Sequence, residues 1–243
     1  MNSMVTTIPL SHLGVMLMPV LLVLGIQYFW TDKNGPGKAG ESLVAMFRML
    51  IQLLLIGYVL QYIFSGQYPL VILAVLMVML GVSSWISIRV VEDRNWRLYL
   101  KAGASILLGC VVTLGLAIAI VLQPEPLFDP RILIPLAGMT ASNAMNTLSL
   151  TIERFDHERR SNNYTLSRNA AFQTAMIPQV NAFMAVGLVS LPGMMTGQVL
   201  AGIDPTIAAR YQIVVMCLIF GASGIAAACY LSLNRFADQD TAA

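Results

Sequence analysis

The sequence predicts an all-α, polytopic membrane protein with about seven transmembrane helices, and three observations support this fold class. Hydrophobic residues make up 57% of the 243 residues and charged residues only 11%, whereas a soluble domain carries about 25% charged residues. Seven stretches are apolar over the roughly 20 residues that a helix needs to cross a bilayer core of about 30 Å. Finally, no stretch shows the strict alternation of apolar and polar residues that is typical of strands.

The seven predicted helices follow one another with short connections, which leaves no room for a soluble domain. They cover residues 8–30, 43–64, 69–88, 100–122, 132–152, 174–195 and 206–233. Two of them have readable starts, Asp129-Pro130 before the fifth and Asp204-Pro205 before the seventh. Aspartate caps free amide groups, and proline suits the first helical position. We therefore expect a single transmembrane domain over residues 1–243.

Positively charged residues are concentrated in alternate loops, and this distribution predicts the orientation of the chain in the membrane. The first, third and fifth loops and the C-terminal tail hold Lys33, Lys38, Arg89, Arg94, Arg97, Lys101, Arg154, Arg159, Arg160, Arg168 and Arg235, whereas the other loops hold only Arg131 and Arg210. Cytoplasmic loops are enriched in lysine and arginine, so the N-terminus is expected outside and the C-terminus in the cytoplasm. The N-terminal segment lacks the basic start of a cleavable signal peptide. The expected location is the inner (plasma) membrane of a bacterium.

Polar residues within the second and fifth predicted helices are candidates for a translocation path or a helix interface. Arg48 and Gln52 lie on one face of the second helix, and for Arg48 both a snorkelling position and a buried contact stay open. The fifth helix carries a polar seam in a 4-3-4 spacing, with a further asparagine beside it: Ser142, Asn146, Ser149 and Glu153, with Asn143 adjacent. This seam predicts an interface between helices, a wall of a polar path, or both in a homodimer.

The stretch SLPGMMTGQVLAGIDP, from Ser190 to Pro205, interrupts the apolar pattern between the last two predicted helices. Broken helices at membrane depth are tolerated where protein or a water-filled cavity surrounds them. We expect an outer gate made of Pro192, Gly193, Met194, Met195, Gly197, Gln198 and Asp204, with Asn181 and Ser190 as polar path residues. Met194 and Met195 also offer thioether ligands for a soft metal, although fifteen methionines in the chain favour plain packing.

Motifs of catalysis and nucleotide binding are missing from the sequence. It contains no GxxxxGK[ST], HExxH or GxSxG motif, and Cys110, Cys217 and Cys229 lie in apolar runs without metal-like spacing. A net charge of +2 gives no indication of nucleic-acid binding. The sequence thus predicts a transport protein, not an enzyme, with no directly bound cofactor. If transport uses ATP, a separate ATP-binding subunit must provide the nucleotide site.

Two blocks of sequence resemble a known family. AGMTASNAMNTLSL and VGLVSLPGMMTGQVLAGIDPTIAARYQIVVM are similar to the signature blocks of FetB-type permeases, the membrane subunits of an iron-export ABC transporter, and MFRMLIQLLLIGYVLQYIF agrees more loosely. Plant aluminium-tolerance proteins, with proposed sugar-nucleotide export, belong to the same family. The resemblance implies a metal exporter, with iron as the first candidate, in which two permeases in the lipid bilayer pair with two ATP-binding subunits.

The chain departs from the family pattern in two places. Ser142 replaces a glycine, which is a small-for-small change. The cytoplasmic segment after the fifth predicted helix is shorter than the family pattern and lacks its Leu-Gly-Ala-Thr-like turn. The resemblance implies that this segment faces the ATP-binding partner through Glu153, Arg154, Arg159, Arg160 and Arg168. Its shortening leaves two alternatives open, a carrier or channel that works without an ATPase and a scaffold that does not transport.

Overall fold

The computed structural model describes residues 14–15, 17–30, 38–64, 69–126 and 128–240. Within these ranges the chain is helical and contains no strand, so the predicted all-α class is confirmed. The helices form two compact units, residues 1–66 and 67–243. The start of the first predicted helix and Lys33 lie outside the described residues.

The N-terminal unit consists of two helices that pack on each other, α2 (Met18–Trp30) and α3 (Lys38–Phe64). Helix α3 begins earlier than predicted, so Arg48 lies three turns into the helix rather than near its start. Arg48 and Gln52 are both exposed on α3, as expected for two residues on one helix face.

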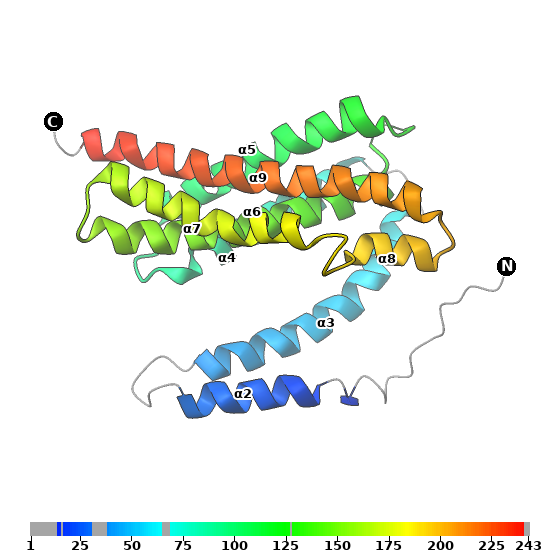
Figure 1. The fold of residues 1–243 in the computed structure, drawn as a ribbon, viewed down its shortest axis with the longest axis horizontal. Coiled ribbons are helices and arrows are strands. Elements are labelled where there is room, and N and C mark those ends of the chain that lie inside the picture. The colour runs from blue at the N-terminus through cyan, green and yellow to red at the C-terminus, as the bar shows by residue number, and fades with distance from the viewer. Residues whose placement is uncertain (1–13, 16, 31–37, 65–68, 127, 241–243) are drawn as a thin grey trace. The chain divides into compact units, whose positions relative to one another are not determined.

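The larger unit is a bundle of long helices with short elements between them (Figure 1). Its elements are α4 (Pro69–Ser87), the 3-10 turn η1 (Ile88–Val90), α5 (Trp96–Leu116), the π-helical segment η2 (Ala117–Leu122), α6 (Pro130–Arg159), α7 (Tyr164–Ala185), α8 (Gly193–Leu200) and α9 (Pro205–Asp240). The predicted starts of α6 and α9 are confirmed, since Asp129 accepts a hydrogen bond from the Arg131 amide and Asp204 accepts one from the Thr206 amide.

Helix α6 lies at the centre of the bundle, where it packs against α4, α5, α7 and α9. Its buried face presents small and branched residues, including Ala144, Leu148 and Ile152, to the core. Helices α5 and α9 approach closely where Gly109 faces Ala222, since a Cβ built on Gly109 would lie 2.5 Å from the Ala222 carbonyl oxygen. The core therefore depends on small residues that let helix backbones come together.

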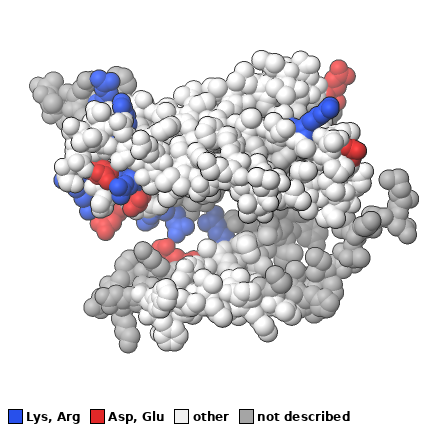
Figure 2. All heavy atoms as spheres, viewed as in Figure 1, with Lys and Arg blue, Asp and Glu red and all other residues white. Residues whose placement is uncertain are grey.

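Four described helices are long and apolar enough to cross a membrane, over Gly40–Gln61, Pro69–Val90, Trp96–Leu122 and Pro205–Arg235. Figure 2 shows charged side chains mainly toward the ends of the larger unit, in keeping with sequence stretches 102–122, 132–152 and 211–234 that hold no charged residue. Helices α6 and α7 are not among the four. The count of seven spans and the orientation of the termini stay predictions.

The sixth predicted helix, residues 174–195, has the wrong boundaries. The observed α7 begins ten residues earlier, ends at Ala185, and is followed by an irregular segment and then by the short α8. Pro178 lies inside α7, and Pro192 immediately precedes α8. Gly187, with φ +81°, turns the chain after α7 in a conformation that favours glycine.

A row of threonines forms the buried polar face of α6. Thr140, Thr147 and Thr151 are at most 1% exposed, and Thr140 and Thr151 donate to carbonyls one turn earlier. Thr147 accepts a hydrogen bond of 3.1 Å from the Gln179 side chain of α7. This is a buried contact between two side chains on different helices, and it fixes how α7 sits against α6.

We expect Gln179→Leu to lower the thermal stability of the purified protein by the equivalent of about 1 kcal/mol, since buried hydrogen bonds between membrane helices contribute roughly 0.6–2 kcal/mol. The double variant Gln179→Leu with Thr147→Val removes both partners, and we expect it to lose little more than the single variant. Thermal unfolding in detergent measures both. The single variant Thr147→Val completes the comparison. If the stability losses of Gln179→Leu and Thr147→Val add up to the loss of the double variant, the hydrogen bond contributes nothing to stability.

Candidate functional site

The polar seam predicted on α6 is exposed along the outer side of that helix. Ser142, Asn146 and Glu153 are exposed and Ser149 is half-buried, and at 3.6 residues per turn the four lie within about 60° of one another. Pro135 and Arg131 continue the same line toward the start of the helix and are also exposed. We call this set, Arg131, Pro135, Ser142, Asn146, Ser149 and Glu153, the α6 stripe.

The α6 stripe lies between the sides of α6 that contact α4 and α7. On one side a Cβ on Gly138 would lie 3.0 Å from the Met79 side chain of α4, and on the other Thr147 bonds to Gln179 of α7. The hydroxyls of Ser142 and Ser149 donate to the carbonyls of Met139 and Met145. Among the described residues the Asn146 side chain has no hydrogen-bond partner, so its amide is available to a ligand or to another chain.

A cavity of about 430 Å³ lies at the end of the bundle where α9 begins, and we call it the chamber. Its walls come from the end of η2, the start of α6, α8 and the start of α9, with Arg131, Met194, Gln198 and Tyr211 among its lining residues. The rest of the lining is mostly apolar, and Gln198 Oε1 is buried there without a partner among the described residues. The chamber therefore offers an apolar surface with a few polar groups, as is usual for small-molecule sites.

The α-helical hydrogen-bond pattern of α5 ends in the π-helical segment η2, next to the chamber. The Gln123 amide donates to the Ile118 carbonyl at 3.0 Å, an i to i−5 bond that closes the π-helical turn. Gln123 itself has a φ of 41°, in the left-handed region, and Leu122 and Pro124 on either side of it line the chamber. Single π-helical turns frequently occur at functional sites. This segment therefore supports the chamber as a candidate functional site.

The predicted outer-gate residues fall into two groups. Met194 and Gln198, one turn apart on α8, line the chamber, while Met195 and Gly197 do not. A Cβ on Gly193 or Gly197 would meet nothing within 4 Å among the residues that the structure describes. The exposed Ser190 and Asn181 also lie outside the chamber lining.

Asp204 has a structural role, because its carboxylate caps α9. It accepts hydrogen bonds from the hydroxyl and the amide of Thr206, and these bonds hold the pKa of the Asp204 carboxyl below its usual value of 3.8. The lowered pKa means that the cap stabilises the fold fully above that usual value and loses its contribution as the pH falls through the lower folded-state pKa.

We therefore expect Asp204→Ala to lower the unfolding temperature at pH 7 and to lose less on acidification below pH 3.8 than the wild type. Asp204→Ser, which keeps a capping oxygen without a titratable group, should retain most of the stability at pH 7. Thermal unfolding at both pH values measures this. Equal stability of the alanine variant and the wild type at pH 7 would show that the cap is dispensable.

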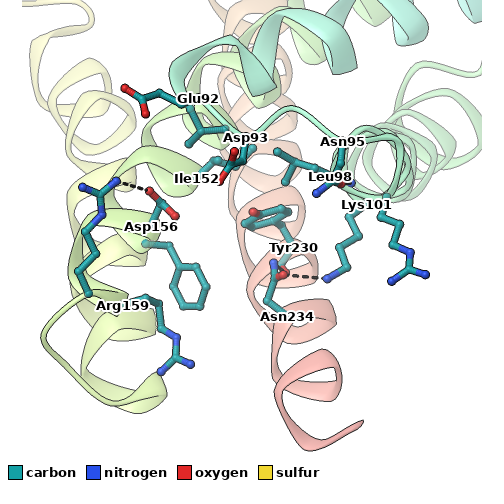
Figure 3. A pocket seen from close by; sticks show the side chains of 14 residues that line it. Glu92, Asp93, Asn95, Leu98, Lys101, Ile152, Asp156, Arg159, Tyr230 and Asn234 are labelled. Carbon is teal, nitrogen blue, oxygen red and sulfur yellow. Dashed lines mark hydrogen bonds and ion pairs between the residues drawn. The ribbon is translucent and has the colours of Figure 1, made fainter. Parts of the chain in front are cut away.

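A second cavity, of about 530 Å³, lies at the opposite end of the bundle, which we call the basic end. The basic end carries nine of the larger unit's arginines and lysines: Arg89, Arg94, Arg97, Lys101, Arg154, Arg159, Arg160, Arg168 and Arg235. The basic-end cavity lies between the loop before α5, the first turns of α5, the end of α6 and the end of α9 (Figure 3). Lys101 donates to Asn234 at 2.8 Å, and Arg160 pairs with Asp156 at 3.2 Å.

The structure changes the interpretation of the predicted partner-facing loop. Residues 153–173 are mostly helix, because α6 continues to Arg159 and α7 begins at Tyr164, which leaves a turn of only residues 160–163. Of the five predicted residues only Arg159 and Arg160 line the basic-end cavity. Arg154 pairs with Glu158 along α6 at 2.6 Å, Glu153 belongs to the α6 stripe, and Arg168 lies over the Tyr164 ring.

Several lining residues of the basic-end cavity were not singled out as site residues from the sequence. Glu92, Asp93, Tyr230 and Asn234 come from the loop before α5 and from the end of α9, far apart in sequence. From the sequence, Arg97 and Lys101 were used only to predict the orientation in the membrane. Their i,i+4 spacing places them on one face of α5. Within the described residues no group of three or more histidine, cysteine, aspartate or glutamate side chains is placed to hold a metal ion.

Both cavities are bounded by the same three helical segments. Helix α5 with η2, α6 and α9 provide walls of the basic-end cavity at one end and of the chamber at the other. Together with the four described helices that are long and apolar enough to cross a membrane, this arrangement indicates a polytopic membrane protein with the α6 stripe along its central helix.

The chain belongs to the UPF0014 family, described as an uncharacterised protein family, whose profile matches residues 12–168 and 159–236. The two matches overlap at residues 159–168, a range that includes the turn between α6 and α7. This match and the relatives named in the next paragraph confirm the resemblance to the FetB-type permeases, and the chain is an integral, multi-pass membrane protein.

Named relatives extend along most of the chain. The "UPF0014 membrane protein slr1647" of Synechocystis is 36% identical over 82% of this chain and 83% of its own length. The "Probable iron export permease protein FetB" of Escherichia coli is 32% identical over 89% and 88%, and the "Protein ALUMINUM SENSITIVE 3" of Arabidopsis thaliana is 31% identical over 86% and 80%. No solved structure matches significantly.

Proposed function

We propose that this chain is the membrane subunit of an ABC-type exporter, which moves its substrate along the α6 stripe and is driven by ATP hydrolysis on a separate subunit. The observation that carries the proposal is the α6 stripe itself, a line of exposed or half-buried residues along the central helix in which every side chain except that of Pro135 is polar. Polar groups facing lipid are costly, so membrane proteins keep them for water-filled paths or for contacts with another chain.

Metal ions are the first substrate candidate, with iron foremost, because one relative bears the name of an iron export permease. Hydroxyl and amide oxygens of Ser142, Asn146 and Ser149 would form the lining that such an ion passes. A sugar nucleotide or another small solute is the second candidate. The uncharged, hydrogen-bonding character of the middle of the α6 stripe and the apolar wall of the chamber favour it.

A test of transport measures substrate efflux from cells that express this chain in three conditions. The cells contain no ATP-binding partner, a wild-type partner, or a partner whose P-loop lysine is replaced. We expect efflux only with the active partner. Equal efflux in all cases would replace the ABC-type proposal with the ATPase-independent carrier or channel, an alternative that the short turn between α6 and α7 favours. Loading the cells with iron or with a labelled sugar nucleotide distinguishes the two substrates.

We also propose that two copies of the chain meet along the α6 stripe, which would enclose the polar groups between subunits. With Cys110, Cys217 and Cys229 replaced by alanine, we expect Asn146→Cys to form a disulfide-linked dimer in membranes on mild oxidation. Val111→Cys, on an exposed part of α5, is the matched control and should stay monomeric. Cross-linking of both variants to the same extent would indicate random collision instead of a defined interface.

A further inference from the structure

We infer that the segment from Gly187 to Gly202, which contains α8, is a movable lid of the chamber. The lid rotates about these two glycines and thereby changes access to the chamber at the end of the α6 stripe. This inference rests on the proposed function for what the lid controls, the passage of the transported solute. The movement itself follows from the packing and the backbone of the segment.

The lid forms one wall of the chamber. Helix α8 lies beside the start of α9 and is separated from α7 by an irregular segment (Figure 1). Met194 and Gln198 of α8 line the chamber together with Arg131 and Pro135 of α6. Arg131 and Pro135 also begin the α6 stripe, so the chamber adjoins this stripe at one end. A shift of α8 therefore changes the space through which a solute passes between the chamber and the α6 stripe.

Few contacts hold α8 in place. Among the described helices, α8 packs extensively against α9 alone, and no residue of α8 is buried. The core of the larger unit instead comes from long helices such as α5, α6 and α9. Segments with few buried apolar contacts open locally at a low cost in free energy. Movement of α8 thus leaves the core of the bundle intact.

A glycine in the left-handed region lies on each side of α8. Gly187, after the end of α7, has a φ of +81°, and Gly202, after the end of α8, has a φ of +90°. The Gly187 amide donates to the Ser190 carbonyl at 3.0 Å, which folds the chain into a tight turn. Glycine adopts φ values of either sign with little penalty, and hinges are single residues that absorb large changes of φ and ψ. The two glycines are therefore placed to act as the hinges of the lid.

The position of α8 in the structure leaves a polar atom unpaired. Gln198 Oε1 is buried and has no hydrogen-bond partner among the described residues. A buried acceptor without a donor destabilises the arrangement that buries it. Rotation of α8 away from the bundle gives this oxygen access to water. The closed position is therefore only weakly favoured, as a lid that opens in each transport cycle requires.

The first experiment measures the distance between α8 and the rest of the larger unit in the full-length chain. All three native cysteines are replaced by alanine, and spin labels are attached to Val199→Cys on α8 and Val111→Cys on α5, both at exposed positions. The reference pair joins Val111→Cys to Ile213→Cys, an exposed position on α9. Dilution with unlabelled chains restricts the signal to distances within one subunit. We expect two distances for the α8 pair and one for the reference pair.

The variant Gly187→Val tests the hinge. A Cβ on Gly187 would meet nothing within 4 Å among the described residues, so valine acts through the backbone conformation and not through a clash. Valine disfavours the left-handed region, and we expect the ratio of the second to the first distance to rise about tenfold. Gly187→Asn is the matched control, since asparagine tolerates this region, and it should behave as the wild type does. Gly202→Val should act in the same direction and replaces Gly187→Val if that variant does not fold.

The second experiment tests the consequence for transport. Met194→Cys on α8 and Ile132→Cys on α6, both in the chamber lining, are joined by a reducible bifunctional thiol reagent in the cysteine-free chain. We expect efflux by the complete transporter to stop and to return after reduction. The single variant Met194→Cys, treated with the same reagent, separates the effect of modification from that of the tether and should lose less efflux.

The results separate the lid from the proposed function. If the α8 pair shows one distance that none of the valine variants changes, the lid is wrong while the proposed function stands. Unchanged efflux from the tethered protein would show that α8 does not control the passage of the solute. If the wild-type chain transports nothing while the α8 pair shows both distances, the proposed function fails and the movement of the lid is supported.

Discussion

Gly109→Ala is expected to lower the stability and the yield of the folded protein, because the contact between α5 and α9 at this position has no space for a methyl group. A Cβ at this position would lie 2.5 Å from the Ala222 carbonyl oxygen and 3.3 Å from its carbonyl carbon. These are backbone atoms of α9, so no side chain can rotate away and α5 and α9 must separate. Overpacking a well-packed core costs about 1–3 kcal/mol and occasionally more, which is a large share of a typical stability of roughly 5–15 kcal/mol.

The measurement is the yield and the unfolding temperature of the detergent-solubilised protein. Gly115→Ala is the matched control, since Gly115 lies on the same helix and its Cβ would meet no atom of the described residues within 4 Å. We expect this control to behave as the wild type does or to be slightly more stable, because alanine favours helix over glycine. Equal stability of the two alanine variants would show that α5 and α9 do not pack as described.

Asn146→Leu is expected to reduce substrate efflux at least tenfold while leaving the folded protein intact. Asn146 is exposed at the middle of the α6 stripe and has no hydrogen-bond partner among the described residues, so leucine breaks no contact within the subunit. It does remove an amide from the proposed path and places an apolar side chain there. A tenfold lower rate corresponds to about 1.4 kcal/mol in the barrier, the size of one good hydrogen bond.

Efflux is measured at matched protein levels in cells or in proteoliposomes that contain the complete transporter. Leu150→Met, a volume-conserving change on the exposed side of α6 next to the α6 stripe, is the control and should transport normally. Wild-type efflux by the Asn146→Leu protein would mean that the substrate passes elsewhere. A loss accompanied by a failure to dimerise would assign Asn146 to the contact between two copies.

The sequence predicted the helical class and the two capped helix starts well, because these depend on local properties. The aspartate-proline pairs before α6 and α9 act through their own next residues, as the contact of Asp129 with the Arg131 amide shows. The sequence predicted an interruption between the last two long helices, but it placed the end of the sixth helix at residue 195, whereas α7 ends at Ala185. The apolar run continued across the irregular segment 186–192, and hydrophobicity alone does not distinguish an apolar helix from an apolar loop.

The sequence predicted which polar residues of α6 share a face, but it did not predict which face is buried. A 4-3-4 spacing places Ser142, Asn146, Ser149 and Glu153 on one side, but the same helix carries a second polar row, Thr140, Thr147 and Thr151, on another. Which row is buried depends on where α4, α5, α7 and α9 pack, and periodicity carries no such information. The threonines face the core and the predicted seam faces outward.

The sequence by itself determined what each segment is: apolar helices, their charged ends, and a family resemblance carried by continuous blocks of residues. These properties follow from composition and from neighbours along the chain. Only the tertiary structure decided which distant residues share a cavity, such as Met194 with Arg131 or Lys101 with Asn234. Such pairs meet because helices pack through small residues like Gly109, at distances and rotations that depend on both partners at once.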